Sequence, residues 1–192
     1  MSSFGNLTIG AVGAAGAAFA WGAKIFYADQ LDNPVNTDWI VNALAPAASD
    51  SMNAALTVRL FDDAVEEGVG FILAIPSGAT NMKLRFKSRA EVVPGAARTV
   101  GVKLYYRQIP DDAAVSATWA GANDGSKILA DIDIPANVNF QYSSQTLVLV
   151  ADFTPDLLAA KTYQFELTRV NPTAGTELVD DWALLEVQVE FS

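Results

Sequence analysis

Apolar and polar residues alternate with a period of two in many segments of this chain, and this pattern restricts the fold more than any other feature. In the clearest segment, charged side chains separate Met82, Leu84 and Phe86. Successive side chains of a β-strand point to opposite faces, so the pattern predicts strands buried on one face. Further candidate strands, alternating or apolar throughout, occur at 24–27, 56–61, 68–75, 100–106, 113–119, 128–134, 140–150, 162–170 and 182–191.

Turn-forming residues separate these segments, and helix signals are few. Pro, Gly, Asn and Asp cluster at 76–78, 94–95, 123–125 and 171–175. Short helical turns are expected at 154–158, which begins with Thr-Pro, and within 36–48. About nine or ten strands at this spacing predict one all-β domain over residues 24–192, an antiparallel β-sandwich of the jelly-roll type. In its last strand we expect a buried row of Leu185, Val187, Val189 and Phe191.

Residues 1–23 differ from the rest because they carry no charged side chain and are rich in small residues. Seven are Ala, five are Gly, and Gly10, Gly13 and Gly16 recur at every third position. The apolar run 9–23 has 15 residues, fewer than the ~20 of a membrane-spanning helix, and no basic residue precedes it as in a signal peptide. We expect an N-terminal arm that packs closely on a neighbouring subunit, or an edge strand of the domain itself.

The chain contains no histidine and no cysteine. Their absence excludes disulfide bonds, imidazole or thiolate metal sites, cysteine nucleophiles and a histidine base. Calcium needs only oxygen ligands, and acidic pairs occur at 62–63, 66–67, 111–112 and 180–181. None of these pairs has the spacing of a calcium-binding loop, so we expect acidic turns and no metal or other cofactor.

Charge is distributed unevenly along the chain, whose net charge is −10. Residues 83–107 carry a net charge of +6, whereas 1–82 and 108–192 carry −6 and −10. We interpret the basic segment as one β-hairpin on an acidic domain. The overall negative charge would repel phosphate groups, which argues against nucleic-acid binding.

Four basic residues of this segment are spaced two apart and would share one face of a strand. They are Lys83, Arg85, Lys87 and Arg89, and we call them the basic strip. One interpretation is a docking surface for an acidic partner or an anionic glycan. The other is a solvated outer face whose side chains pair with acidic residues across strands. Tyr105, expected beside the basic strip, is the best candidate for an exposed aromatic residue that stacks on a sugar.

Catalysis by paired carboxylates is the enzymatic possibility that remains. Glycoside hydrolysis needs two carboxyl groups about 5–9.5 Å apart in a cleft. Asp131 and Asp133 would lie about 7 Å apart on one face of a strand. Acidic side chains are ordinary on a solvated face, and no other residue marks a cleft. We therefore expect a protein that is not an enzyme.

Several stretches resemble a family of small virion proteins of tailed bacteriophages. They are 26–34 (FYADQLDNP), 38–46 (DWIVNALAP), 84–91 (LRFKSRAE), 163–169 (YQFELTR) and 181–187 (DWALLEV). The resemblance covers residues 24–192, and the arm departs from it. It implies a jelly-roll structural protein without a catalytic motif, on the exterior of the capsid or on the tail.

The resemblance leads to two functional hypotheses. The first is a capsid decoration or cement protein, made in the host cytoplasm, that binds the major capsid protein in the virion as a homotrimer. The arm glycines and the basic strip would then dock on capsid subunits. The alternative is a tail-associated jelly-roll module that binds a receptor or a carbohydrate. Neither hypothesis involves a membrane.

Overall fold

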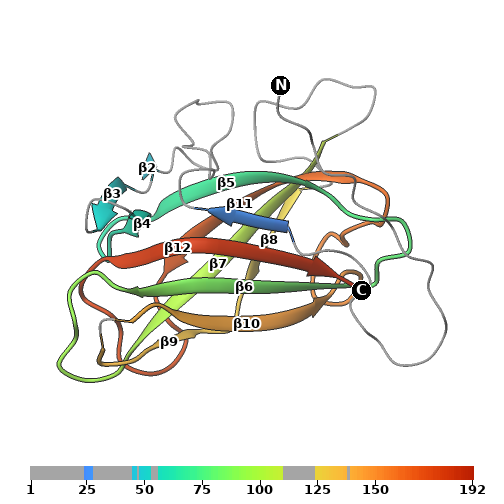
Figure 1. The fold of residues 1–192 in the computed structure, drawn as a ribbon. Helices are drawn as coiled ribbons and strands as arrows, with labels where there is room; N and C mark the ends of the chain where they lie inside the picture. Colours follow the sequence, from blue (N-terminus) through green and yellow to red (C-terminus); the bar gives the residue numbers. More distant parts are fainter. Residues whose placement is uncertain (1–23, 28–44, 47, 53–55, 110–123, 138) are drawn as a thin grey trace, which may run out of the picture.

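The alternating segments form strands that pack as two layers of β-sheet (Figure 1). The computed structural model describes residues 24–27, 45–46, 48–52, 56–109, 124–137 and 139–192. The strands in this part of the chain are β1 (Lys24–Tyr27), β2 (Ala45–Pro46), β3 (Ala48–Met52), β4 (Leu56–Phe61), β5 (Glu67–Ala74), β6 (Asn81–Ala90), β7 (Arg98–Ile109), β8 (Asp124–Ile128), β9 (Ile132–Ile134), β10 (Gln141–Val148), β11 (Thr162–Val170) and β12 (Trp182–Phe191).

The strands divide into two six-stranded sheets. The β6 sheet has the order β10-β6-β12-β4-β3, with β1 also paired with β12. The β7 sheet has the order β2-β5-β11-β7-β8, with β9 also paired with β7. Among the described strands, β2 and β5 run parallel and the other neighbours run antiparallel. The predicted fold class, an antiparallel jelly-roll sandwich, is confirmed.

The core lies between the two sheets and contains the inward rows that the alternation predicts. Leu84 on β6 and Leu104 on β7 are fully buried in it. Phe26 on β1 reaches across to Phe71 on β5, with ring centroids 4.8 Å apart. An aromatic pair of this kind contributes about 0.5–1.5 kcal/mol beyond its buried area, so the short strand β1 is anchored to the opposite sheet.

β6 and β7 do not form the hairpin that the charge pattern led us to expect. β6 lies between β10 and β12, whereas β7 lies between β11 and β8 in the other sheet. The connection after Ala90 therefore crosses from one layer to the other. Crossing lets the apolar rows of both strands face each other across the core. As a result, the basic residues of 83–107 are shared between two opposite outer faces of the molecule.

β12 contains a β-bulge that changes which of its side chains face the core. The pairing with β6 shifts between Leu184 and Glu186, which leaves Leu185 out of register. The prediction that Leu185 shares the buried row of Val187 is therefore wrong. Leu184 takes the core position, and Leu185 packs instead against a smaller cluster that includes Val58.

Residues 154–158 form no helical turn, contrary to the prediction from Thr-Pro. The amide of Leu157 donates a hydrogen bond to the carbonyl of Leu149 (3.0 Å). The amide of Leu158 donates to the hydroxyl of Tyr163 (2.9 Å). Because partners outside the segment take these backbone donors, the segment follows the end of β10 rather than winding into a helix.

The candidate strand at 128–134 is divided into β8 and β9 in the structure. Between them, the amide of Leu129 donates to the carbonyl of Val102 (2.8 Å), and the amide of Ala130 donates to the side chain of Gln145 (2.9 Å). The predicted turn at 123–125 is also wrong in part, because β8 begins at Asp124.

Other predictions fall outside the described residues. They are the arm at 1–23 with Gly10, Gly13 and Gly16, and the strand at 113–119. The same holds for the helix at 36–48 as far as residue 44, and its end falls in β2 and β3.

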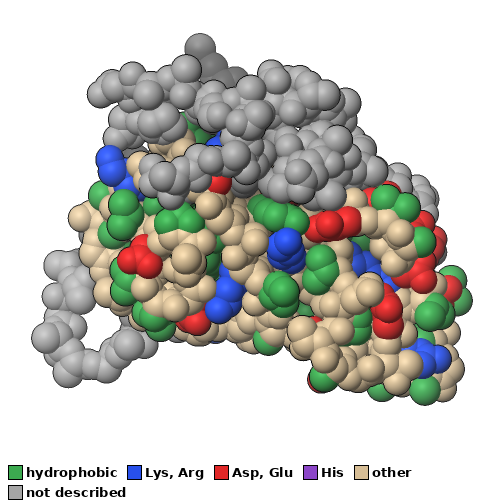
Figure 2. Space-filling view, turned by 180° about the vertical axis from the view of Figure 1, so that it is seen from behind, with side chains coloured by type: hydrophobic (Ala, Val, Ile, Leu, Met, Phe, Trp, Pro, Cys, Tyr) green, Lys and Arg blue, Asp and Glu red, His purple; other side chains and the backbone are tan. Residues whose placement is uncertain are grey.

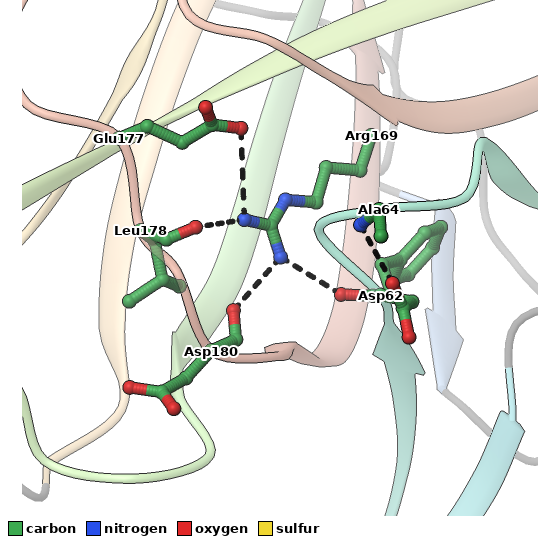
Figure 3. A network of polar contacts seen from close by, with 7 residues as sticks. Asp62, Ala64, Arg169, Glu177, Leu178 and Asp180 are labelled. Carbon is green, nitrogen blue, oxygen red and sulfur yellow. Dashed lines mark hydrogen bonds and ion pairs between the residues drawn. The ribbon is translucent and has the colours of Figure 1, made fainter.

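Arg169 near the end of β11 holds one end of the sandwich together (Figure 3). Its guanidinium donates to the carbonyls of Phe61 (2.9 Å), Asp180 (2.8 Å) and Leu178. Glu177 lies 4.0 Å away as an ion-pair partner. Burial lowers the pKa of Arg169, and neighbouring carboxylates oppose that shift. One side chain thus connects β11 to the end of β4 and to the segment before β12.

Candidate functional site

The outer face of the β6 sheet brings together side chains from four neighbouring strands. On β6 these are the basic residues, which alternate with the buried row and are only partly buried. The register places Tyr142 and Glu186 on either side of Lys87, with Tyr27 beyond Glu186. We call this surface the β6 face; its members are Tyr142, Ser144, Thr146, Lys83, Arg85, Lys87, Glu186, Gln188, Glu190, Ile25 and Tyr27.

The side chain of Tyr142 extends from β10 across β6, so that its hydroxyl reaches β12. The hydroxyl donates a hydrogen bond of 2.5 Å to Glu186. On the way, the ring lies close to two cations, with the Arg85 guanidinium 4.6 Å and the Lys87 ammonium 5.2 Å from its centroid. Tyr142 is nevertheless 47% exposed, so the β6 face presents an aromatic ring that is fixed at both ends.

Glu186 is the polar anchor beneath this ring. It is only 5% exposed, and the amide group of Gln188 also donates to it (2.8 Å). The hydrogen bond to Glu186 is the largest cause that raises the pKa of the Tyr142 hydroxyl, so this hydroxyl remains a donor at neutral pH. Gln188 in turn accepts a hydrogen bond from Arg85 (3.0 Å). The orientation of the ring is therefore set by a connected polar network.

The residues of the basic strip differ in the partners that they contact. At one end Lys83 pairs with Glu190 across the strands (3.8 Å), as expected of a solvated face. At the other end the guanidinium of Arg89 lies 5.2 Å from the ring of Phe140. In the middle, Arg85 and Lys87 flank Tyr142. Cross-strand pairing is thus confirmed at one end of the strip, and its role as a docking surface stays a prediction.

Tyr105 does not lie beside the basic strip, because β7 belongs to the other sheet. It is partly buried, accepts a hydrogen bond from Lys103 (2.7 Å) and donates one to Glu66 (3.1 Å). Burial is the main cause that raises its pKa. Figure 2 shows this opposite side of the molecule, where basic and acidic side chains are interspersed with hydrophobic ones. Tyr142, which is far more exposed, takes the position on the β6 face that we had assigned to Tyr105.

A pocket of about 220 Å³ lies between the turn after β4 and the end of β11. Its polar groups are mainly acidic, and Arg169 in its wall already binds backbone carbonyls. Burial and nearby carboxylates raise the pKa of Asp181 close to this end of the sandwich. Within the described residues, no group of three acidic side chains is arranged as a metal site. The lining residues are Asp62, Asp63, Ala64, Val65, Glu66, Arg169, Val170 and Asn171.

Asp131 has a structural role that accounts for its carboxylate. It accepts hydrogen bonds from the amides of Thr173 (2.9 Å) and Ala174 (2.9 Å), and from the Thr173 hydroxyl (2.7 Å). Burial would raise its pKa, but these hydrogen bonds lower it. It precedes β9, whereas Asp133 lies within β9, so the two do not form the pair on one strand considered above.

The described part of the chain contains no helix that is long and apolar enough to cross a bilayer.

Comparison with solved structures finds a similar sandwich in several carbohydrate-binding modules. A family 35 carbohydrate binding module from Clostridium thermocellum shares 10% identity at a TM-score of 0.50, covering 88% of this chain and 97% of that one. The CBM36-1 domain of a xylanase from the hindgut metagenome of Trinervitermes trinervoides shares 6% identity at a TM-score of 0.44, with coverages of 88% and 96%. The xylan-binding module CBM86 from Roseburia intestinalis shares 14% identity at a TM-score of 0.40, with coverages of 89% and 96%.

At these identities the likeness is one of fold. No protein-family model and no curated protein matches the chain. The comparisons give no support to the expected resemblance to phage virion proteins.

Three members of the β6 face escaped the sequence analysis, namely Tyr142, Glu186 and Gln188. Tyr142 begins an outward row on β10, so its exposure could have been predicted from the alternation. Its contact with Glu186 could not, because the two are 44 residues apart and come together only through the strand order. The outward position of Glu186 follows from the expected buried row of Val187 and Val189, whereas the bulge at Leu185 leaves no clear signal in the alternation.

Proposed function

We propose that this protein is a non-catalytic carbohydrate-binding module whose ligand lies on the β6 face. The observation that carries the proposal is the ring of Tyr142, which is exposed yet held at both ends. A fixed aromatic ring gives contact area at a low cost in conformational entropy, because few rotatable bonds remain to be ordered. The apolar face of a sugar ring is a suitable partner for such a surface.

Polar groups around Tyr142 supply the hydrogen bonds that sugar hydroxyls need. Arg85 and Lys87 are donors, and Ser144 and Thr146 follow Tyr142 in the outward row of β10. Four strands at a spacing of about 4.8 Å make this surface roughly 14 Å wide, enough for an oligosaccharide chain. Tyr27, which is 46% exposed, adds a second ring at the β1 side.

The fold supports the same proposal. The module from Clostridium thermocellum has a comparable sandwich over nearly its whole length. A shared fold does not by itself assign a function, so the argument depends on the residues of the β6 face. In this role a carboxylate such as that of Asp131 fixes a turn through hydrogen bonds.

The test compares Tyr142→Ala with Tyr105→Ala, a matched change on the opposite sheet. Binding of the intact chain to a panel of soluble polysaccharides is measured by affinity electrophoresis and calorimetry. Loss of a central aromatic contact costs about 1.5 kcal/mol, so Tyr142→Ala should weaken binding roughly tenfold. Tyr105→Ala should bind as the wild type does. Equal binding by both variants, or no binding of the wild type to any polysaccharide, would contradict the proposal.

A further inference from the structure

Building on the proposed function, we infer that the polysaccharide bound by the β6 face is anionic. Arg85 and Lys87 would contact its carboxylate or sulfate groups while a sugar ring lies on Tyr142. The basis is that the charged side chains around Tyr142 have different partners from the other charged side chains on this face.

Arg85 and Lys87 contact neutral groups. Arg85 donates to the amide oxygen of Gln188 (3.0 Å) and lies 4.6 Å from the centroid of the Tyr142 ring. Lys87 lies 5.2 Å from the same centroid. Within the described residues, neither cation forms an ion pair at 4 Å or less, whereas Lys83 on the same strand pairs with Glu190. Both cations are only partly buried, so a ligand can reach them.

The carboxylate nearest to Lys87 in the register lies on the β6 face but is almost fully covered. Glu186 stands opposite Lys87 in the register, but it is only 5% exposed and accepts hydrogen bonds from Tyr142 and Gln188. Both hydrogen bonds come from neutral donors and end on one carboxylate oxygen, Oε1, and little of the side chain reaches solvent. The charge that the centre of the β6 face presents to a ligand is positive.

Anionic groups on a sugar fit this arrangement. A guanidinium binds a carboxylate or a sulfate through paired hydrogen bonds, which are stronger than those between neutral groups. The net charge of −10 on the whole chain repels a polyanion at a distance, so selection must come from direct contact with these two side chains. Lys87 and Arg85 lie two residues apart, about 7 Å along the strand, and both are within 5.2 Å of the ring centroid.

The experiment uses two pairs of probes that differ only in charge. Polygalacturonate is compared with its methyl ester, and dextran sulfate with dextran, each titrated into the intact wild-type chain. We expect at least tenfold tighter binding of one charged polymer than of its uncharged partner. Preference for polygalacturonate identifies carboxylate as the recognised group, and preference for dextran sulfate identifies sulfate; either result supports the inference.

Two double variants with the same change in net charge locate the effect. Arg85→Gln with Lys87→Gln should lose the preference for the charged polymer. Lys103→Gln with Lys127→Gln, which lie on the β7 sheet, should retain it. Thermal denaturation confirms that both variants are folded. If the first variant keeps the preference, or the second loses it, the inference is overturned.

The outcomes separate this inference from the proposed function. Equal affinity for charged and uncharged polymers, lost in Tyr142→Ala, would overturn the inference and leave the carbohydrate-binding function standing. Binding to none of the four polymers would overturn the inference, and the wider panel would then decide the proposed function.

Discussion

The close approach of neighbouring backbones limits which side chain fits at single positions of this sandwich. Gly101 on β7 pairs with Val170 on β11, and the chain after β11 turns over it. A Cβ atom on Gly101 would lie 2.7 Å from the carbonyl oxygen of Val170 and would also meet the carbonyl of Asn171. Backbone atoms cannot turn aside as the end of a side chain can. Gly95 in the connection between β6 and β7 has no atom within 4 Å of the same position.

Gly101→Ala is therefore expected to lower the free energy of unfolding by about 2 kcal/mol, because overpacking of this kind forces the backbone to shift. Gly95→Ala should change it by less than ~0.5 kcal/mol, as is usual at an open surface position. Urea denaturation of both variants measures the difference. Similar stabilities for the two variants would show that the approach of β11 to Gly101 is looser than described.

Elements of the fold are held in place by a few long-range connections. At one end of the sandwich, hydrogen bonds of Arg169 join β11 to β4 and to the segment before β12. Its carbonyl partners belong to two separate segments, the end of β4 at Phe61 and the residues Leu178 and Asp180 before β12. Removing the guanidinium would leave buried acceptors without a donor, and each such group costs about 1–3 kcal/mol.

Arg169→Met should therefore destabilise the protein by roughly 3 kcal/mol or more. Arg169→Lys keeps the charge, but one ammonium group cannot follow the fork of a guanidinium to all three carbonyls. It should fall between Met and the wild type in urea denaturation. A Lys variant as stable as the wild type would mean that charge alone, rather than the carbonyl contacts, stabilises this end.

The elements themselves follow largely from the sequence. β11 and β12 have the predicted bounds, because strong alternation ends at clear turn residues. The bulge at Leu185 and the division of 128–134 depend instead on partners elsewhere in the fold. The crossing between β6 and β7 is of the same kind, since a turn signal does not say whether a chain returns in the same sheet.

At the scale of the whole molecule, the two outer faces differ in what they offer a ligand. The β6 face carries an exposed ring between two cations, whereas Tyr105 on the other face is engaged with Lys103 and Glu66. The sequence supplied the basic strip as a candidate site, and the fold added Tyr142 and its anchor. The basic side chains of the candidate site could thus be predicted, whereas the contact between Tyr142 and Glu186 could not. Alternation indicates which face of a sheet a side chain lies on, but not which strands are neighbours.

The expectations of a virion location, a capsid partner and a homotrimer stay predictions. They were based on the resemblance and on the arm at 1–23, which lies outside the described residues. The comparisons show the fold alone, a sandwich like that of a family 35 carbohydrate binding module, so the carbohydrate-binding alternative also stays a proposal.

The central claim is that carbohydrate binds on the β6 face, and amide chemical shifts of the intact chain measure this most directly. Spectra are recorded while the polysaccharide that binds best, or an oligosaccharide derived from it, is added. We expect the shifted amides to gather on β10, β6 and β12 around Tyr142, Lys87 and Glu186. Shifts gathered at the pocket around residues 62–66 and Arg169, or on the β7 sheet, would contradict it.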